Sequence, residues 1–250
     1  MLLDWDYMLG RLPLIMEAIP RTLLMVLVSA AVGFIFGFVL AIVRSYKIPV
    51  LSQLATAYIS IFRGVPLLVQ MYLVYFGLPD IFSYFNEVFG GGFLPTEFNN
   101  MFIALLIFSL YTAAYQAEVW YAALHTVDYS QMEAALSVGM TLPQALLRIF
   151  IPQALVSALP NFANLFIALF KQTSLAFTIK VIDIMAVAKM EAGSTYRYLE
   201  MYVLVAIVYW LLILGFERLF VFLEQYFSNQ KKHNAVSKRR KKGIQENQAK

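Results

Sequence analysis

Long apolar stretches alternate with short polar segments along this chain. Five of these stretches reach the roughly 20 residues that an α-helix needs to cross a hydrocarbon layer about 30 Å thick. The second is interrupted at Arg63-Gly64-Val65-Pro66. The pattern predicts an all-α integral membrane bundle of about five transmembrane helices. The stretches cover Thr22–Val43, Leu54–Leu78, Met101–Tyr121, Ala154–Phe170 and Tyr198–Phe222.

Composition supports a membrane location. Hydrophobic residues make up 61% of the 250 residues and charged residues only 14%. Soluble domains are roughly 45–50% apolar and about 25% charged. A soluble fold of this length has too little interior to hide so much apolar surface, so lipid must cover the excess. The absence of cysteine excludes disulfides, thiolate metal sites and cysteine nucleophiles.

Two segments fit neither a clean span nor a plain loop. Residues 122–153 form a polar, helix-favouring connection. Residues 171–197 are semi-polar and too short to cross twice, so we expect a re-entrant or pore-lining piece, because polar backbone at membrane depth survives only inside protein or beside water. We expect a transmembrane domain over 1–228, followed by a disordered basic tail over 229–250.

The distribution of Lys and Arg predicts the orientation, since cytoplasmic loops carry an excess of these residues. Residues 231–242 contain seven Lys or Arg and no acid, whereas loop 79–100 contains three acids and no base. The basic residues of 171–197, which would then lie outside, argue against this orientation. We expect the N-terminus outside, and the C-terminus together with loops 44–53 and 122–153 in the cytoplasm.

The connection 122–153 contains helix start and stop signals. The segment 128–130 (Asp-Tyr-Ser) can begin a helix, with Glu133 in its first turn. Gly139 accepts a positive φ angle and can end that helix. We expect a second short helix from Pro143 that ends before Pro152.

Such a pair of helices forms a compact knob. Ala134 and Ala135 are small, so another surface can approach them closely, and Glu133 offers one projecting carboxylate. The knob is a suitable docking element for a soluble partner. An ordinary amphipathic connecting helix is the alternative.

The same segment carries a family resemblance. Glu133-Ala134-Ala135-x3-Gly139-x9-Ile149-x-Ile151-Pro152 resembles the cytoplasmic loop signature of ABC importer membrane subunits. Ile151 stands where that family usually has leucine.

Three further motifs, in order along the chain, are similar to the polar amino acid branch of that family. The branch usually has threonine at Val65 and an aspartate or asparagine at Gln172. It also has Arg-Gly-Gly where this chain has Tyr-Ala-Ala at 121–123. The motifs are Arg63-Gly64-Val65-Pro66-Leu67-Leu68-Val69-Gln70, Ala114-Tyr115-x2-Glu118 and Lys171-Gln172-Thr173-Ser174-Leu175.

The resemblance implies a type I ABC importer transmembrane fold in the plasma membrane of a prokaryote. Glu133, Ala134, Ala135 and Gly139 would then contact ATP-binding cassette ATPase subunits, which bind the ATP and magnesium. A second permease subunit, identical or paralogous, and an extracellular solute-binding protein would complete the system.

The chain itself offers no catalytic, metal or nucleotide site. It lacks a Gly-x4-Gly-Lys-Ser/Thr phosphate loop, and its two histidines, His125 and His233, show no metal-ligand spacing. We therefore expect no cofactor and no enzymatic activity in this subunit.

Charged and polar residues within the spans are candidates for a translocation path or gate. A buried charge is costly and should face protein or water. An amino acid carries both a carboxylate and an ammonium group, so its path needs both signs of charge. Structural ion pairs and interhelical hydrogen bonds are the alternative. The candidates are Arg63, Gln70, Glu118, Asn161, Asn164, Lys171, Thr173 and Ser174.

Other functions fit the sequence less well. A secondary carrier or channel would need no ATPase, but an inverted repeat typical of carriers is missing. A membrane protein whose basic tail binds nucleic acid would leave the ordered motifs unexplained, so we expect lipid and no nucleic acid as a partner. The resemblance implies a polar amino acid as the substrate, and residues 173–185 weakly resemble the cystine-type members.

Overall fold

The computed structural model describes residues 3–92 and 97–248, with side chains up to residue 227. Within these ranges the chain is all-α, as predicted, and contains no strand. The elements are α1 (Trp5–Ser45), α2 (Leu51–Gly64), α3 (Leu67–Phe89), α4 (Asn100–His125), α5 (Ser130–Ser137), α6 (Leu142–Ala145), the π-helical η1 (Leu146–Phe150), α7 (Ile151–Gln172), the 3₁₀-helical η2 (Thr173–Ile179), α8 (Ile184–Thr195) and α9 (Tyr198–Gln248).

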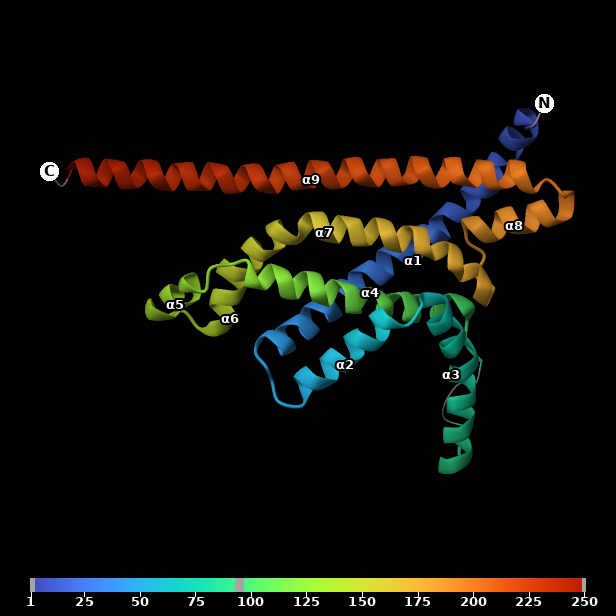
Figure 1. The fold of residues 1–250 in the computed structure, drawn as a ribbon, viewed down its shortest axis with the longest axis horizontal. Helices are drawn as coiled ribbons and strands as arrows, with labels where there is room; N and C mark the ends of the chain where they lie inside the picture. The colour runs from blue at the N-terminus through green and yellow to red at the C-terminus, as the bar shows by residue number, and fades with distance from the viewer. Residues whose placement is uncertain (1–2, 93–96, 249–250) are drawn as a thin grey trace.

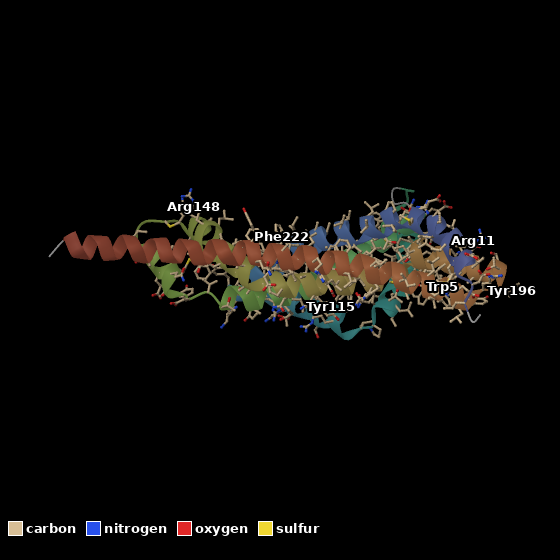
Figure 2. The ribbon with its side chains drawn as sticks, turned by 90° about the horizontal axis from the view of Figure 1, so that it is seen from above. Trp5, Arg11, Tyr115, Arg148, Tyr196 and Phe222 are labelled. Carbon is tan, nitrogen blue, oxygen red and sulfur yellow. The ribbon has the colours of Figure 1, made fainter. Side chains whose placement is uncertain are left out.

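The long helices set the axis of the molecule. Helices α4, α7 and α9 run roughly along the longest axis, and α1 crosses them obliquely (Figure 1). Arg148, beside α6, and Tyr196, after α8, mark the two opposite ends in Figure 2. These ends are called the α5 end and the α8 end below. Among the described residues, five helical stretches are long and apolar enough to cross a membrane, which agrees with the number predicted.

Small residues let α1 and α4 pack closely together. Gly33 and Gly37 of α1 lie one turn apart in a Gly-x-x-x-Gly pattern, which is typical of close helix contacts in membranes. A Cβ atom added at Gly37 would lie 2.9 Å from the carbonyl oxygen of Ala113 and 2.9 Å from the backbone nitrogen of Ala117. The backbones of the two helices therefore touch, and no larger residue fits between them.

The predicted second span is not one helix. Proline disfavours a helical conformation in the residue before it, and Val65 is extended, with φ −97° and ψ 133°. The chain therefore breaks between α2 and α3 at Pro66. Gln70 Nε2 donates to the carbonyl oxygens of Phe62 (2.9 Å) and Val65 (2.7 Å), so it satisfies carbonyls left free at the break.

The predicted end of a helix before Pro152 is also wrong. Helix α6 continues through η1 into α7, and Pro152 occupies the first turn of α7. A proline inside a continuous helix removes one backbone donor, and here the wider π-helical turn η1 lies directly before it, with the Ile151 N–H donating to the Leu146 carbonyl oxygen.

Residues 171–197 fold back on the bundle through the end of α7, η2 and α8. Helix α8 packs against α1 and α9 through a buried cluster that includes Ile15, Ile184, Ala188 and Met201. The expectation of a disordered tail over 229–250 stays a prediction. Helix α9 extends through most of it, and its side chains lie outside the described residues.

Candidate coupling loop and translocation groove

The segment α5–α6–η1 has a small core of its own. Met132, Ala135, Ala145 and Phe150 are all buried together there. Ala135 therefore packs inside the knob, and it does not belong to the exposed small-residue surface that its sequence position suggested. The core holds α5 in a fixed orientation against α6.

The opposite side of α5 faces outward. Glu133 and Ala134 are exposed, as are Leu136 (44%) and Val138 (79%). Gly139 follows with φ +84°, so it ends the helix in the left-handed conformation predicted from the sequence. An exposed carboxylate with neighbouring exposed apolar side chains is the composition of a docking surface.

Two of the charged residues predicted within the spans, Arg63 and Glu118, form an ion pair, and Arg44 joins them. Glu118 Oε1 lies 2.7 Å from Arg44 Nη1 and 3.3 Å from Arg63 Nη1. The guanidinium of Arg44 stacks over Tyr121 (4.7 Å to the ring centroid), and that of Arg63 over Tyr115 (5.6 Å). One carboxylate therefore ties the end of α1 and the end of α2 to α4, so Arg63 and Glu118 form a structural lock beside the α2–α3 break.

Two other predicted residues line a groove between α7 and α9. Lys171 and Ser174 lie on one wall, and Glu217, Tyr202 and Trp210 of α9 lie on the other, around a volume of about 600 Å³. The groove therefore offers one cation and one anion. Sequence reasoning missed Glu217, although an acid within an apolar span is a usable signal.

A second, smaller groove lies between the same two helices. It has a volume of about 290 Å³ and is lined by Asn164, Pro160, Glu217 and Glu224, among others. Glu217 borders both grooves. The polar face between α7 and α9 thus contains Asn164, Lys171 and Ser174 from the predicted set.

The remaining candidates lie elsewhere. Thr173 is completely buried, and its hydroxyl donates to the Phe170 carbonyl oxygen at 2.7 Å. Gln70 closes the α2–α3 break. Asn161 is exposed on α7 and does not border either groove.

Comparison with known proteins identifies the family. The family described as "Binding-protein-dependent transport system inner membrane component" matches residues 11–229. This chain belongs to that family. The resemblance to ABC importer permeases is thereby confirmed, and the chain is a multi-pass membrane protein.

Several curated relatives of this permease span most of its length. It is 45% identical over 84% of its length to the probable amino-acid permease protein YxeN of Bacillus subtilis (strain 168), covering 89% of that protein. It is 38% identical over 83% of its length to the L-cystine transport system permease protein TcyL of the same organism, covering 84% of it.

Solved structures agree with the fold of the permease. One described as an amino acid ABC transporter with histidines is 29% identical, with a TM-score of 0.75 over 90% of this chain and 99% of that chain. The MetNI methionine ABC transporter in an inward-facing conformation has a TM-score of 0.67 over 85% of this chain and 95% of that chain. At 16% identity it supports the fold alone.

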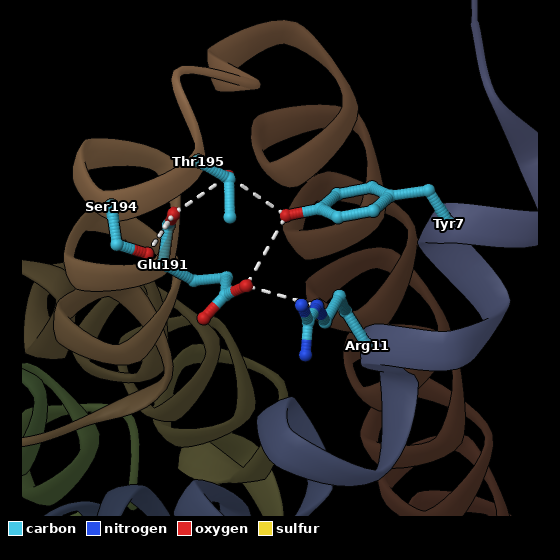
Figure 3. Close-up of polar contacts among 5 residues, drawn as sticks. All are labelled: Tyr7, Arg11, Glu191, Ser194 and Thr195. Atoms are coloured by element: carbon cyan, nitrogen blue, oxygen red, sulfur yellow. Dashed lines mark hydrogen bonds and ion pairs between the residues drawn. The ribbon is translucent and has the colours of Figure 1, made fainter.

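The α8 end of the permease is fastened by polar contacts. Figure 3 shows the carboxylate of Glu191 of α8 directed toward two residues of α1. Its Oε1 lies 2.9 Å from Arg11 Nε and accepts from the Tyr7 hydroxyl at 3.3 Å, while that hydroxyl also lies 2.9 Å from Thr195 Oγ1. These contacts hold α8 against the start of α1.

The permease also contains a buried carboxyl group that sequence reasoning did not single out. Asp183 is fully buried and caps α8, its Oδ1 accepting from the Ala186 N–H at 2.8 Å. Its Oδ2 has no partner of standard hydrogen-bond geometry among the described residues. Burial raises the pKa of Asp183 to about 6, although the Ala186 N–H opposes that rise.

We predict that stability falls as pH rises because of Asp183. A carboxyl group whose pKa is raised on folding binds its proton more tightly in the folded state, so stability decreases from about pH 4 through the folded pKa of about 6. Asp183→Asn keeps a good helix cap and should remove this dependence. Thermal unfolding of the purified protein in detergent between about pH 4.5 and 7.5 measures it, and equal pH slopes for the two proteins would contradict it.

We also predict unequal effects from the two arginines of the lock. Arg44→Gln should lower the melting temperature more than Arg63→Gln, because Arg44 is closer to Glu118 and less exposed (19% against 45%). Exposed pairs contribute about 0–1 kcal/mol, so the Arg63 effect should be small. Lys47→Gln, in the exposed loop after α1, is the control, and a larger loss for Arg63→Gln would refute the ranking.

Proposed function

We propose that this chain is the membrane-spanning permease subunit of an ATP-driven amino acid uptake system. The coupling loop is the observation that carries the proposal. Its exposed Glu133 and Val138, held by a separate small core, suit a soluble partner that pushes or pulls on the bundle. Curated relatives at 45% and 38% identity are named as amino-acid and L-cystine permeases, which supports an amino acid as the substrate.

The partners follow from this assignment. Two ATP-binding cassette ATPase subunits, which bind ATP and magnesium, would dock at the α5 end through Glu133, Ala134 and the turn at Gly139. A second permease subunit would complete the pathway, and a solute-binding protein would deliver the amino acid at the α8 end. This places the N-terminus outside and the C-terminus in the cytoplasm, as the basic residues of 231–242 favour.

The groove between α7 and α9 is our candidate for part of the translocation path. Lys171 can attract the carboxylate of an amino acid and Glu217 its ammonium group, while Asn164 and Ser174 offer neutral hydrogen-bonding groups beside them. Cystine, a polar amino acid with two such charged ends, is the substrate that the TcyL relative suggests.

Co-purification and transport test the function. An ATPase encoded beside this chain should co-purify with it, and the complex in proteoliposomes should take up radiolabelled cystine or another polar amino acid only with ATP and the binding protein. Uptake that needs no ATPase would overturn the proposal in favour of a carrier or channel.

The groove has its own prediction. Lys171→Gln and Glu217→Gln should each reduce uptake at least about tenfold, since losing one charge–charge hydrogen bond of about 1.5–3 kcal/mol in the bound state corresponds to that factor. Glu200→Gln, an acid of α9 outside both grooves, is the control for Glu217. Unchanged uptake in both groove variants would exclude this groove from the path.

A further inference from the structure

The second part of α3 stands apart from the rest of the chain. Helix α3 leaves the bundle across the direction of α9, close to the α8 end (Figure 1). Its buried residues are Leu67, Gln70 and Met71, all within its first two turns. Leu67 and Met71 share a core with Ile103 and Ile107 of α4. Val74 and Tyr75 in the next turn are partly buried against the same core, and Phe82 contacts Phe98. Most of the other residues of 80–89 are exposed.

The direction of α3 has a consequence in a membrane. Helices α4, α7 and α9 must run across the bilayer, because their apolar stretches are long enough to span it. A helix that lies across their direction therefore lies along the membrane plane. Length and composition alone make α3 a candidate span, but its direction is wrong for crossing. The second crossing, from the α5 end toward the α8 end, is then made by α2 (Figure 1).

The residue pattern after Pro79 divides this part of α3 into two faces. At 100° per residue, Asp80, Ser83 and Glu87 fall on one side. The other side contains apolar residues with large exposed fractions: Ile81 (51%), Phe85 (42%), Val88 (57%) and Phe89 (71%). Tyr84 (64%) lies at the border between the two sides. This strong segregation of polar and apolar residues is typical of a helix that lies between water and hydrocarbon.

We propose that residues 79–89 form an amphipathic helix that lies on the membrane surface at the α8 end and binds lipid. The apolar side enters the boundary between headgroups and acyl chains, where Tyr and other aromatic residues are favoured. Asp80 and Glu87 remain in water. The proposal does not depend on the transported substrate or on the ATPase.

A lipid surface explains this pattern better than a second copy of the chain does. A helix that lies on a membrane surface has hydrocarbon on one side and water on the other along its whole length. The division into an apolar and a polar side likewise continues along the whole of 79–89. A contact with another subunit would need the apolar side only where the two helices meet. Two acids without a base on the segment also suit a neutral lipid surface.

Because the chain has no cysteine, single introduced cysteines test the proposal in the full-length protein. Nitroxide labels would be attached to Phe85→Cys, Val88→Cys and Phe89→Cys on the apolar side, and to Asp80→Cys, Ser83→Cys and Glu87→Cys on the polar side. The labelled transporter would be reconstituted in phosphatidylcholine vesicles. Accessibility to oxygen, which concentrates in lipid, and to a water-soluble nickel chelate would then be measured.

The expected result is a helical alternation along the segment. Apolar-side labels should be several-fold more accessible to oxygen, at a constant depth of about 5–10 Å, and polar-side labels more accessible to the nickel chelate. A depth that changes steadily by about 1.5 Å per residue would mean that α3 crosses the bilayer. Apolar-side labels shielded from both reagents, with dipolar coupling between subunits, would mean that a second copy covers this face. Either outcome overturns the proposal.

Discussion

Replacing Gly139 with valine should abolish ATP-driven uptake while the protein still accumulates in the membrane. Gly139 adopts φ +84°, where an L-residue costs about 1–2 kcal/mol and a β-branched one more. No atom lies within 4 Å of an added Cβ, so the strain is confined to the backbone of this turn. The turn should relax, and α5 should then shift relative to α6 and to the docked ATPase.

The control is Gly139→Asn, because asparagine tolerates the left-handed conformation and should retain most of the uptake. The measurement is the amount of amino acid transported per ATP hydrolysed in proteoliposomes. In Gly139→Val, ATP hydrolysis should no longer depend on the substrate-loaded binding protein. Wild-type coupling in the valine variant would show that the turn does not position the docking surface. Glu133→Lys should uncouple in the same way, since it reverses the exposed charge of α5.

Replacing Gly37 with leucine should cause the largest loss of stability among single changes in this chain. The added side chain would meet the Ala113 carbonyl oxygen and the Ala117 backbone nitrogen at 2.9 Å or less. Overpacking costs about 1–3 kcal/mol where side chains can move, and here the obstacle is backbone. With about 2–4 °C per kcal/mol for a chain of this size, we expect a melting temperature lower by at least about 6–12 °C.

Gly10→Leu is the matched control for this change. It lies in the same helix with nothing within 4 Å of its added Cβ, and leucine favours helix more than glycine does, so its stability should be unchanged or slightly higher. Fluorescence-detected size-exclusion chromatography after heating measures both variants. Equal melting temperatures would show that α1 and α4 can separate without cost.

The sequence predicted the coupling loop correctly at the positions where a single residue and its immediate neighbours decide the backbone conformation. The helix start at Asp128–Ser130 and the stop at Gly139 depend on side-chain capping and on the freedom of glycine, which act within one turn. The predicted end before Pro152 was wrong, because the helix continues through that proline. A proline within a helix leaves one carbonyl without its usual donor. The π-helical turn directly before Pro152 shows that this helix widens locally and does not end there.

The break at Val65–Pro66 could be predicted from the sequence, but the direction of the helix that follows it could not. Proline forbids a continuous helix at that point, whereas the direction that α3 takes afterwards depends on how Leu67 and Met71 pack against α4. A hydropathy profile reports how many apolar residues a segment contains, but not how the segment is oriented in the folded protein. It therefore placed a span where the structure has two helices at an angle.

The sequence by itself determined that this chain is an α-helical membrane protein, which family it resembles, and where its coupling knob begins and turns. These properties follow from composition, apolar length and local capping, all of which are short-range. Only the tertiary structure decided that Glu118 joins Arg44 to Arg63, that Glu217 faces the same groove as Lys171, and that Asp183 is buried. Each of these contacts joins residues far apart in the chain, and they meet because helix packing, which no single segment encodes, brings their helices together.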